Sequence, residues 1–234
     1  MKYIVSNSLS AVDNMLLDSF LTLCTNDSYF RLYRWEKATL SLGVKNSLDE
    51  LNLDSVKKYG IDVVYRESGG GIIYHNSDVC FSFIGNLDLK PKENYNYVKR
   101  IIETILKKLG ANITITNEKN LSSFICFNGS SKYEISVDNK KVVGIAQKII
   151  KSRYLIQGSI QLKESNLSSF VQEDITQFGL ESFEYKKIEE MFLKYLNNLV
   201  FMEEIKEDEI IKNSSYKEFK KKNLNRFYVK DLDE

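Results

Sequence analysis

The chain has 234 residues, of which 43% are hydrophobic, and it carries 33 basic against 32 acidic side chains. That length and apolar content suffice for one sizeable core, so a single domain is expected over residues 1–234. The net charge of +1 provides no global field to attract nucleic acid or anionic lipid. No apolar run approaches the roughly 20 residues of a bilayer-spanning helix, and the first residues lack a secretory-signal pattern. We therefore expect a soluble, cytoplasmic protein with neither nucleic acid nor membrane as a partner.

Cysteine and histidine usage argues against metal and disulfide chemistry. Cys24, Cys80 and Cys126 are an odd count without CxxC spacing, and His75 is the only histidine. No metal site is expected. Cys24 and Cys80 lie within apolar periodic segments, which is typical of buried, inert thiols.

The first half of the chain predicts one helix followed by a series of strands. Apolar residues at helical spacing behind Ser10 predict an amphipathic helix over 10–24 that packs on a sheet. A short helix is expected near 49–58. Strands, indicated by β-branched and aromatic runs, are expected at 29–35, 38–42, 61–65, 72–74 and 79–83.

The second half adds a hairpin and more helices. The apolar stripe from Val98 to Leu109 predicts a helix that begins after Pro91 and ends at Gly110. A hairpin is expected over 133–143, with its turn at 138–140, and a further strand over 154–162. Residues from about 186 to 234 read as a mainly helical C-terminal extension. Clustered strands followed by segregated helices indicate an α+β fold, with mixed or antiparallel sheets flanked by helices.

Three adjacent glycines form the strongest local feature of the sequence, within the segment Arg66 to His75. Without side chains, their backbone N–H groups can approach a phosphate, a carboxylate or a developing oxyanion. The segment matches neither GxGxxG nor a Walker loop, which disfavours a dinucleotide-binding fold. Arg66 and His75 flank the turn, so an anion pocket stands as an even alternative to a flexible turn between strands.

Two further segments carry residue types suited to chemistry. Lys141 begins an apolar strand, where a solvent-facing lysine is the ordinary alternative, and Gly144 suggests a bulge or a close approach to a ligand. Cys126 stands at the entrance to a polar loop. An accessible cysteine near a cation such as Lys141 is a candidate nucleophile, whereas a buried inert thiol is the alternative.

Taken in order, these segments resemble the lipoate-protein ligase and octanoyltransferase family of the biotin and lipoate protein ligase superfamily. The family motif of arginine, Ser-Gly-Gly-Gly, two apolar residues, an aromatic and a histidine is similar to Arg66–His75. The family's Lys-Val/Ile-x-Gly-x-Ala-Gln pattern is similar to 141–147, and its first strand pair resembles 33–43. The resemblance implies that family's catalytic-domain fold.

The resemblance also implies the roles of individual residues. Lys141 is expected at the carboxyl oxygens of the acyl group. The aliphatic chain needs an apolar slot, for which Trp35, Tyr74 and Phe81 are candidates. The full set of expected substrate-binding residues is Trp35, Arg66, Ser68, Gly69, Gly70, Gly71, Ile72, Ile73, Tyr74, His75, Gly144, Ile145 and Ala146.

Cys126 decides between branches of the family. Cys-Phe-x-x-x-Ser-x-Tyr-Glu, at 126–134, resembles the octanoyltransferases that hold octanoate as a thioester. Catalysis by Cys126 and Lys141 would then move octanoate from octanoyl-acyl carrier protein to a lysine of a lipoyl domain. The acceptor would be a glycine cleavage H protein or a 2-oxoacid dehydrogenase E2, and no cofactor would be needed.

Two alternatives remain beside the transferase. One is a lipoate-protein ligase using ATP and Mg through lipoyl-AMP, and the other is a binding module that grips acylated carrier domains without turnover. Two positions depart from the family pattern: Gln157 stands where relatives have histidine, and Asn46 where many have glutamine. The histidine's replacement is the best support for the binding module.

Overall fold

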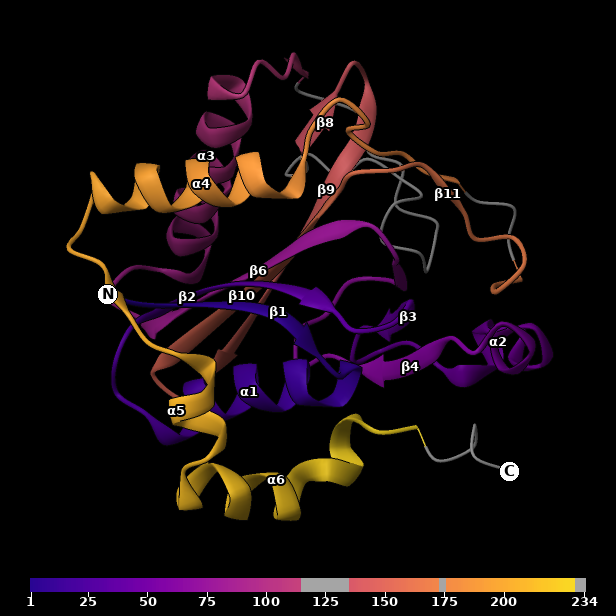
Figure 1. Ribbon diagram of the computed structural model, residues 1–234, viewed down its shortest axis with the longest axis horizontal. Helices are drawn as coiled ribbons and strands as arrows, with labels where there is room; N and C mark the ends of the chain where they lie inside the picture. Colours follow the sequence, from indigo (N-terminus) through magenta and orange to yellow (C-terminus); the bar gives the residue numbers. More distant parts are fainter. Residues whose placement is uncertain (115–134, 173–175, 230–234) are drawn as a thin grey trace.

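The structure, a computed structural model, describes residues 1–114, 135–172 and 176–229. Its helices are α1 (Ala11–Cys24), α2 (Leu53–Tyr59), α3 (Pro91–Lys108), α4 (Tyr185–Asn197), α5 (Glu207–Ile211) and α6 (Ser214–Phe227), with a 3-10 turn η1 (Leu48–Glu50). Figure 1 shows α3 and α4 on one face of a large sheet and α1, α5 and α6 on the other. The predicted α+β class is confirmed.

The large sheet has eight strands in the order β13-β1-β2-β6-β10-β9-β8-β7. These are β13 (Glu203–Glu204), β1 (Lys2–Leu9), β2 (Tyr29–Trp35), β6 (Asp78–Asn86), β10 (Arg153–Gln161), β9 (Lys140–Ile150), β8 (Ile135–Val137) and β7 (Ile113–Thr114). A second sheet, in the order β4-β3-β5, contains β4 (Asp62–Tyr65), β3 (Thr39–Leu42) and β5 (Ile73–His75). The short strands β11 (Ser165–Asn166) and β12 (Thr176–Gln177) pair separately.

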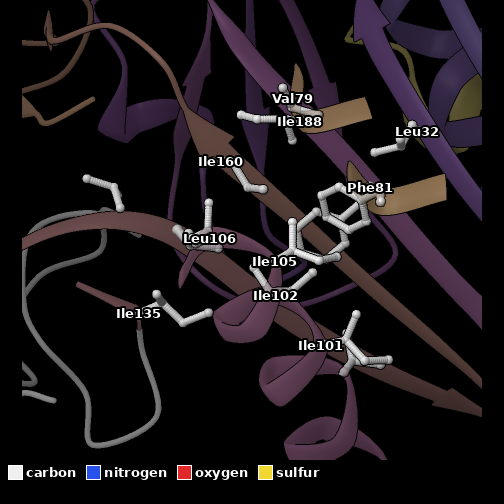
Figure 2. Packing of buried hydrophobic residues seen from close by; sticks show 14 of the residues in the cluster. Leu32, Val79, Phe81, Ile101, Ile102, Ile105, Leu106, Ile135, Ile160 and Ile188 are labelled. Carbon is white, nitrogen blue, oxygen red and sulfur yellow. The ribbon is translucent and has the colours of Figure 1, made fainter. Parts of the chain in front are cut away.

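The face of the large sheet under α3 and α4 holds the largest apolar core. Alternate residues of the central strands point there, among them Phe30 and Leu32 of β2 and Phe81 of β6. Ile102 and Ile105 of α3 are fully buried against them (Figure 2). Each such side chain contributes about 1.5–3 kcal/mol relative to an exposed one, so this layer supplies much of the driving force for folding.

The opposite face, against α1, is polar at its centre. Arg31 of β2, Ser82 of β6 and Gln157 of β10 lie side by side in the strand register, and all three are buried. Helix α1 meets them with Asp18, which is 0% exposed. Asp18 forms a buried ion pair with Arg31 and accepts hydrogen bonds from Ser82 Oγ at 2.8 Å and Gln157 Nε2 at 2.8 Å.

Helix α1 is therefore only partly the amphipathic helix that its apolar spacing predicts. The cap at Ser10 is confirmed, because its side chain accepts from the Asp13 backbone N–H at 3.1 Å. Asn14 and Asp18, one turn apart, add a buried polar stripe that faces the sheet. The expectation of a buried Cys24 is wrong, since the helix ends there and the residue is exposed.

Most of the remaining predicted elements agree with the structure within a few residues, but β9 continues to Ile150, seven residues beyond the predicted end of the hairpin at 143. Pro91 occupies the first helical position of α3, where its missing N–H costs nothing, and Gly110 follows the helix with a φ of 94°. The hairpin turn at Asp138 and Asn139 has φ values of 49° and 62°, as a two-residue primed turn requires. Among the described residues, no helix has both the length and the apolarity to span a bilayer.

We predict that the buried ion pair contributes far more to stability than a surface pair. Asp18→Asn leaves the Arg31 charge unpaired in the interior and should lower the free energy of unfolding by about 3–5 kcal/mol. Asp208→Asn is the matched control, because Asp208 pairs with Lys212 on the surface with 62% of its side chain exposed; its loss should be below about 1 kcal/mol. Urea unfolding measures both, and equal losses would contradict this account.

Candidate functional site

The glycine turn, residues 66–71, connects β4 to β5 and packs against the end of β3. A Cβ on Gly43 would lie 2.1 Å from the carbonyl oxygen of Gly70, so the two backbones meet at a distance that only glycine permits. Gly70 itself has a φ of 91°, in the region that favours glycine. The Val44 N–H donates to the Ser68 carbonyl at 3.2 Å. Gly43 is thus required by close packing and Gly70 by its conformation, whereas a Cβ on Gly69 would meet no atom within 4 Å. The contacts at Gly43, Gly70 and Ser68 disfavour the flexible-turn alternative.

Arg66 holds this turn from within. Its Nη1 donates to the carbonyl and the hydroxyl of Ser41, both at 2.6 Å. Its Nη2 donates to the carbonyls of Gly69 at 3.2 Å and Gly71 at 2.7 Å. Arg66 is buried, so its guanidinium acts as the internal support of the turn.

The neighbouring residues of the turn are held from other directions. Glu67 accepts from Ser19 Oγ of α1 at 2.9 Å and pairs with Arg226 of α6 at 2.6 Å. Ser68 Oγ donates to Gln157 Oε1 of β10 at 2.7 Å. Helices and sheet therefore fix the turn together.

His75 continues the polar chain on the far side of Ser41. Ser41 Oγ lies 2.6 Å from His75 Nε2, and His75 Nδ1 lies 2.6 Å from Asp78 Oδ2. Because Ser41 Oγ accepts from Arg66, the pattern assigns its proton to Nε2 and the ring proton to Nδ1, facing the carboxylate. Ser159 Oγ also donates to Asp78, at 2.5 Å. Burial alone would raise the pKa of Asp78, but His75 and the donated hydrogen bonds outweigh it and lower the pKa below its ordinary value.

Cys80 adds a thiol to the same cluster. Its Sγ lies 3.1 Å from Asp78 Oδ2, and Trp35 Nε1 donates to Sγ at 3.1 Å. Burial, followed by the charge of Asp78, raises the pKa of Cys80 well above its ordinary value. Both Cys80 and Asp78 face Nδ1 of His75, whereas a nucleophile and the residue that orients its base occupy opposite ring nitrogens. This cysteine is therefore an inert part of the wall, as the sequence predicts.

His75, Asp78 and Cys80 also offer ligand atoms within 4.8 Å of one another. The 2.6 Å between His75 Nδ1 and Asp78 Oδ2 is a hydrogen-bond distance. Two ligands on one tetrahedral zinc ion would lie about 3.3 Å apart. The donor set is arranged as a hydrogen-bonded cluster and does not fit a metal ion.

A pocket lies between the glycine turn and the strands β2, β5, β6, β9 and β10. One part is polar, with Arg66, Ser68 and Gln157, and the other is largely apolar, with Trp35 and Ile145. The full lining is Tyr33, Trp35, Arg66, Ser68, Ile73, His75, Cys80, Gly144, Ile145, Ala146, Gln157, Gly158 and Ser159. The Trp35 ring stacks on His75 with centroids 4.4 Å apart. The pocket thus sets an apolar wall beside a polar end at the turn, around a free volume of about 20 Å³.

Eight of the residues expected from the sequence meet in this pocket: Trp35, Arg66, Ser68, Ile73, His75, Gly144, Ile145 and Ala146. Ile72 and Tyr74 instead pack in a second core with Phe170. Phe81 lies behind the pocket, where its ring occupies the space that a Cβ on Gly158 would need. Lys141 is buried in β9, contrary to the solvent-facing alternative, but the lining formed by the described residues does not include it. Cys126 falls outside the described residues.

Several members of the site were not predicted from the sequence. Ser41, Asp78 and Ser159 were not among the expected site residues, although Ser41 lies within the 33–43 segment, and they come together only through the register that pairs β10 with β6 and β5 with β3. Asn46 proves adequate for its place: its Oδ1 accepts from the Gly43 N–H at 2.9 Å and its Nδ2 donates to Glu50 at 2.8 Å. The shorter amide is sufficient to close this turn.

The chain is similar to several known proteins. Residues 10–207 match the model of the lipoyl protein ligase A/B catalytic domain. The octanoyltransferase LipM of Carboxydothermus hydrogenoformans is 32% identical over 69% of this chain, a match that spans 65% of that relative's length. The octanoyltransferase LipM of Bacillus subtilis is 29% identical over 94% of this chain and 83% of its own. The resemblance stated from the motifs is confirmed.

A solved structure gives the same fold at low identity. The bi-partite lipoate protein ligase of Thermoplasma acidophilum, described with its E2 lipoyl domain, superposes with a TM-score of 0.75 at 14% identity. The superposition covers 96% of this chain and 92% of that one. The predicted lipoate-ligase type of catalytic-domain fold is confirmed.

We predict that the thiols of Cys24 and Cys80 differ sharply in reactivity. In a Cys126→Ala background, Ellman's reagent should modify one thiol quickly, the exposed Cys24, between pH 7 and 9. Cys80 should remain a thiol through this range, because its raised pKa keeps the thiolate from forming as the pH rises, and should react only after unfolding. A Cys24→Ala, Cys126→Ala variant should show no fast phase. Two fast equivalents in the folded single variant would contradict the inert assignment.

Proposed function

Because the chain belongs to the family of lipoyl protein ligase A/B catalytic domains, we propose that it is an octanoyltransferase of lipoate biosynthesis that works through a thioester on Cys126. It is an enzyme of the acyltransferase class, as its relatives are. The observation that carries the proposal is the pocket beside the glycine turn. Its apolar wall suits an acyl chain, and its polar end suits the acyl carbonyl.

The pocket supports acyl binding because one side of it is apolar and the other is polar. The aliphatic part of octanoate would lie along Trp35 and Ile145, where burial of each methylene contributes about 0.8 kcal/mol. The carbonyl would face the glycine turn, whose conformation Arg66 fixes through the carbonyls of Gly69 and Gly71. A turn fixed before the reaction can stabilise charge without reorganising.

The chemistry would proceed in two acyl transfers. The Cys126 thiolate attacks the thioester carbonyl of octanoyl-acyl carrier protein, and the carrier thiol leaves as the enzyme thioester forms. The ε-amine of a lysine on a lipoyl domain then attacks that thioester, forms the amide and releases the Cys126 thiol. The first step exchanges one thioester for another, and the second lowers the free energy because an amide replaces a thioester. Neither ATP nor a metal ion would therefore be required.

Lys141 would supply a positive charge to the tetrahedral intermediates. It lies three residues before Gly144, which lines the pocket from the same strand, and it is buried where its charge is poorly screened. Removal of one donor of this kind costs about 3–4 kcal/mol of transition-state stabilisation. The segment that carries Cys126 connects β7 to β8, and β8 pairs with β9, the strand of Lys141.

We predict that octanoate forms a covalent adduct with the enzyme and that this adduct requires Cys126 but not Cys24. Purified protein incubated with octanoyl-acyl carrier protein, without ATP, should gain the mass of one octanoyl group and pass it to an added lipoyl domain. Cys126→Ala should abolish both, because the nucleophile is gone. Cys24→Ala, which removes an exposed thiol at the end of α1, should retain both. Intact-mass measurement of enzyme and domain provides the readout.

The same assay separates the alternatives. Modification of the domain only when lipoate, ATP and Mg are supplied, with no adduct on the enzyme, would overturn the transferase and establish a ligase. Absence of adduct and of transfer with every substrate pair, together with retained binding of octanoyl-acyl carrier protein, would establish the binding module.

A further inference from the structure

Gln157 lies where the pocket meets the buried ion pair. Its side chain is 4% exposed and both ends of its amide are used. Oε1 accepts from Ser68 Oγ of the glycine turn at 2.7 Å, and Nε2 donates to Asp18 Oδ2 of α1 at 2.8 Å. The amide is thus a direct link between the turn and the centre of the protein.

We propose that Gln157 is a positioning residue, which fixes the glycine turn to the Asp18–Arg31 pair through a link that does not titrate. The proposal rests on the octanoyltransferase function, because it concerns the geometry in which that reaction would occur. Gln157 would act through Ser68 and not on the acyl group itself.

The two partners define which chemical groups can occupy this position. The Asp18 carboxylate only accepts hydrogen bonds, so the linking side chain must present a donor to it. The Ser68 hydroxyl donates its proton, so the same side chain must present an acceptor on its other end. A primary amide meets both demands in one planar group. An imidazole, the group that the family pattern places here, meets them only in its neutral form and changes charge between about pH 5 and 8.

The surroundings of Gln157 contain several charges, but the contacts of its amide are few. Met15 Sδ lies 3.7 Å from Nε2, and Ala146 lies opposite on β9. Asp18 is already engaged by Arg31 and by Ser82. The titratable or charged side chains on the elements packed around the link include Asp18 of α1, Arg31 and Tyr33 of β2, Arg66 and Glu67 of the turn, His75 of β5, Asp78 and Cys80 of β6, and Lys141 and Lys148 of β9.

The link also completes the support of the turn. Arg66 donates to the carbonyls of Gly69 and Gly71, and Glu67 accepts a hydrogen bond from helix α1. Among the described residues, the Ser68 side chain is hydrogen-bonded to β10 only through Gln157. Loss of the link would free the middle of the turn while leaving its ends in place. The expected result is slower catalysis in a protein that still folds, with some loss of stability because Asp18 loses one of its donors.

The test compares two near-isosteric substitutions. Gln157→Met keeps the length of the side chain, removes both hydrogen bonds, and should lower kcat/KM for octanoyl-acyl carrier protein about ten- to a hundredfold relative to wild type. The loss should appear mainly in kcat and stay constant between pH 5.5 and 8.5. The matched variant Gln157→Glu introduces a carboxyl that mimics the amide only while protonated, when its O–H donates to Asp18 and its carbonyl accepts from Ser68.

The pH profile of Gln157→Glu therefore carries the specific prediction. Relative to wild type at each pH, its activity should come within about threefold at pH 5.5 and fall at least about tenfold by pH 8.5, because the ionised form faces the Asp18 carboxylate without a donor. A residue that only fills space would give parallel, pH-independent losses in both variants. That outcome, or wild-type activity in Gln157→Met, would overturn the proposal.

A second readout is independent of the transfer reaction. Hydrogen exchange of the wild-type and Gln157→Met proteins should differ at the Val44 amide, which donates to Ser68, and across residues 66–71, with faster exchange in the variant. Exchange in α3 should be unchanged, which reports an intact fold. If wild type transfers no octanoate, the proposed function fails while this comparison still decides the link. Identical exchange of the turn in both proteins would overturn it.

Discussion

The arrangement of this molecule depends on one buried ion pair, between Asp18 of α1 and Arg31 of β2. Two charges removed from water are tolerated only when additional hydrogen bonds satisfy the groups around them. Here Asn14, Ser82 and Gln157 provide them, so helix α1 and the three central strands are joined through polar contacts. The polar face of the sheet follows from this pair, and the glycine turn is built against that face.

The two faces of the large sheet differ in polarity and in what they contribute to the structure. The layer under α3 and α4 is apolar and holds the largest apolar core. The layer over α1 is polar at its centre, and hydrogen bonds of fixed direction set the geometry of the turn and of the pocket. Two chains of contacts reach the turn from this layer: one runs from Asp18 through Gln157 to Ser68, and the other links Asp78 through His75 and Ser41 to Arg66.

Periodicity and turn chemistry were sufficient to predict most helices and strands, because these depend on local patterns such as Pro91 at a helix start and Asp138-Asn139 in a hairpin. The motif from Arg66 to His75 likewise predicted where a pocket forms. The polar layer was not predictable in the same way. Asp18 reads as a solvent-facing acid within a helix, and its burial becomes visible only when the register brings Arg31, Ser82 and Gln157 together. The burial of Cys24 was predicted wrongly because its apolar periodic segment was taken as a sign of burial, although the predicted helix ends at that residue.

The central claim, that the pocket beside the glycine turn receives the acyl chain, is tested most directly by a crystal structure of the protein after acylation with octanoyl-acyl carrier protein. This account predicts the octanoyl chain between Trp35 and Ile145, with its carbonyl oxygen at the glycine turn and its carbonyl carbon bonded to Cys126. An octanoyl group bound elsewhere on the protein, with this pocket unoccupied, would contradict it.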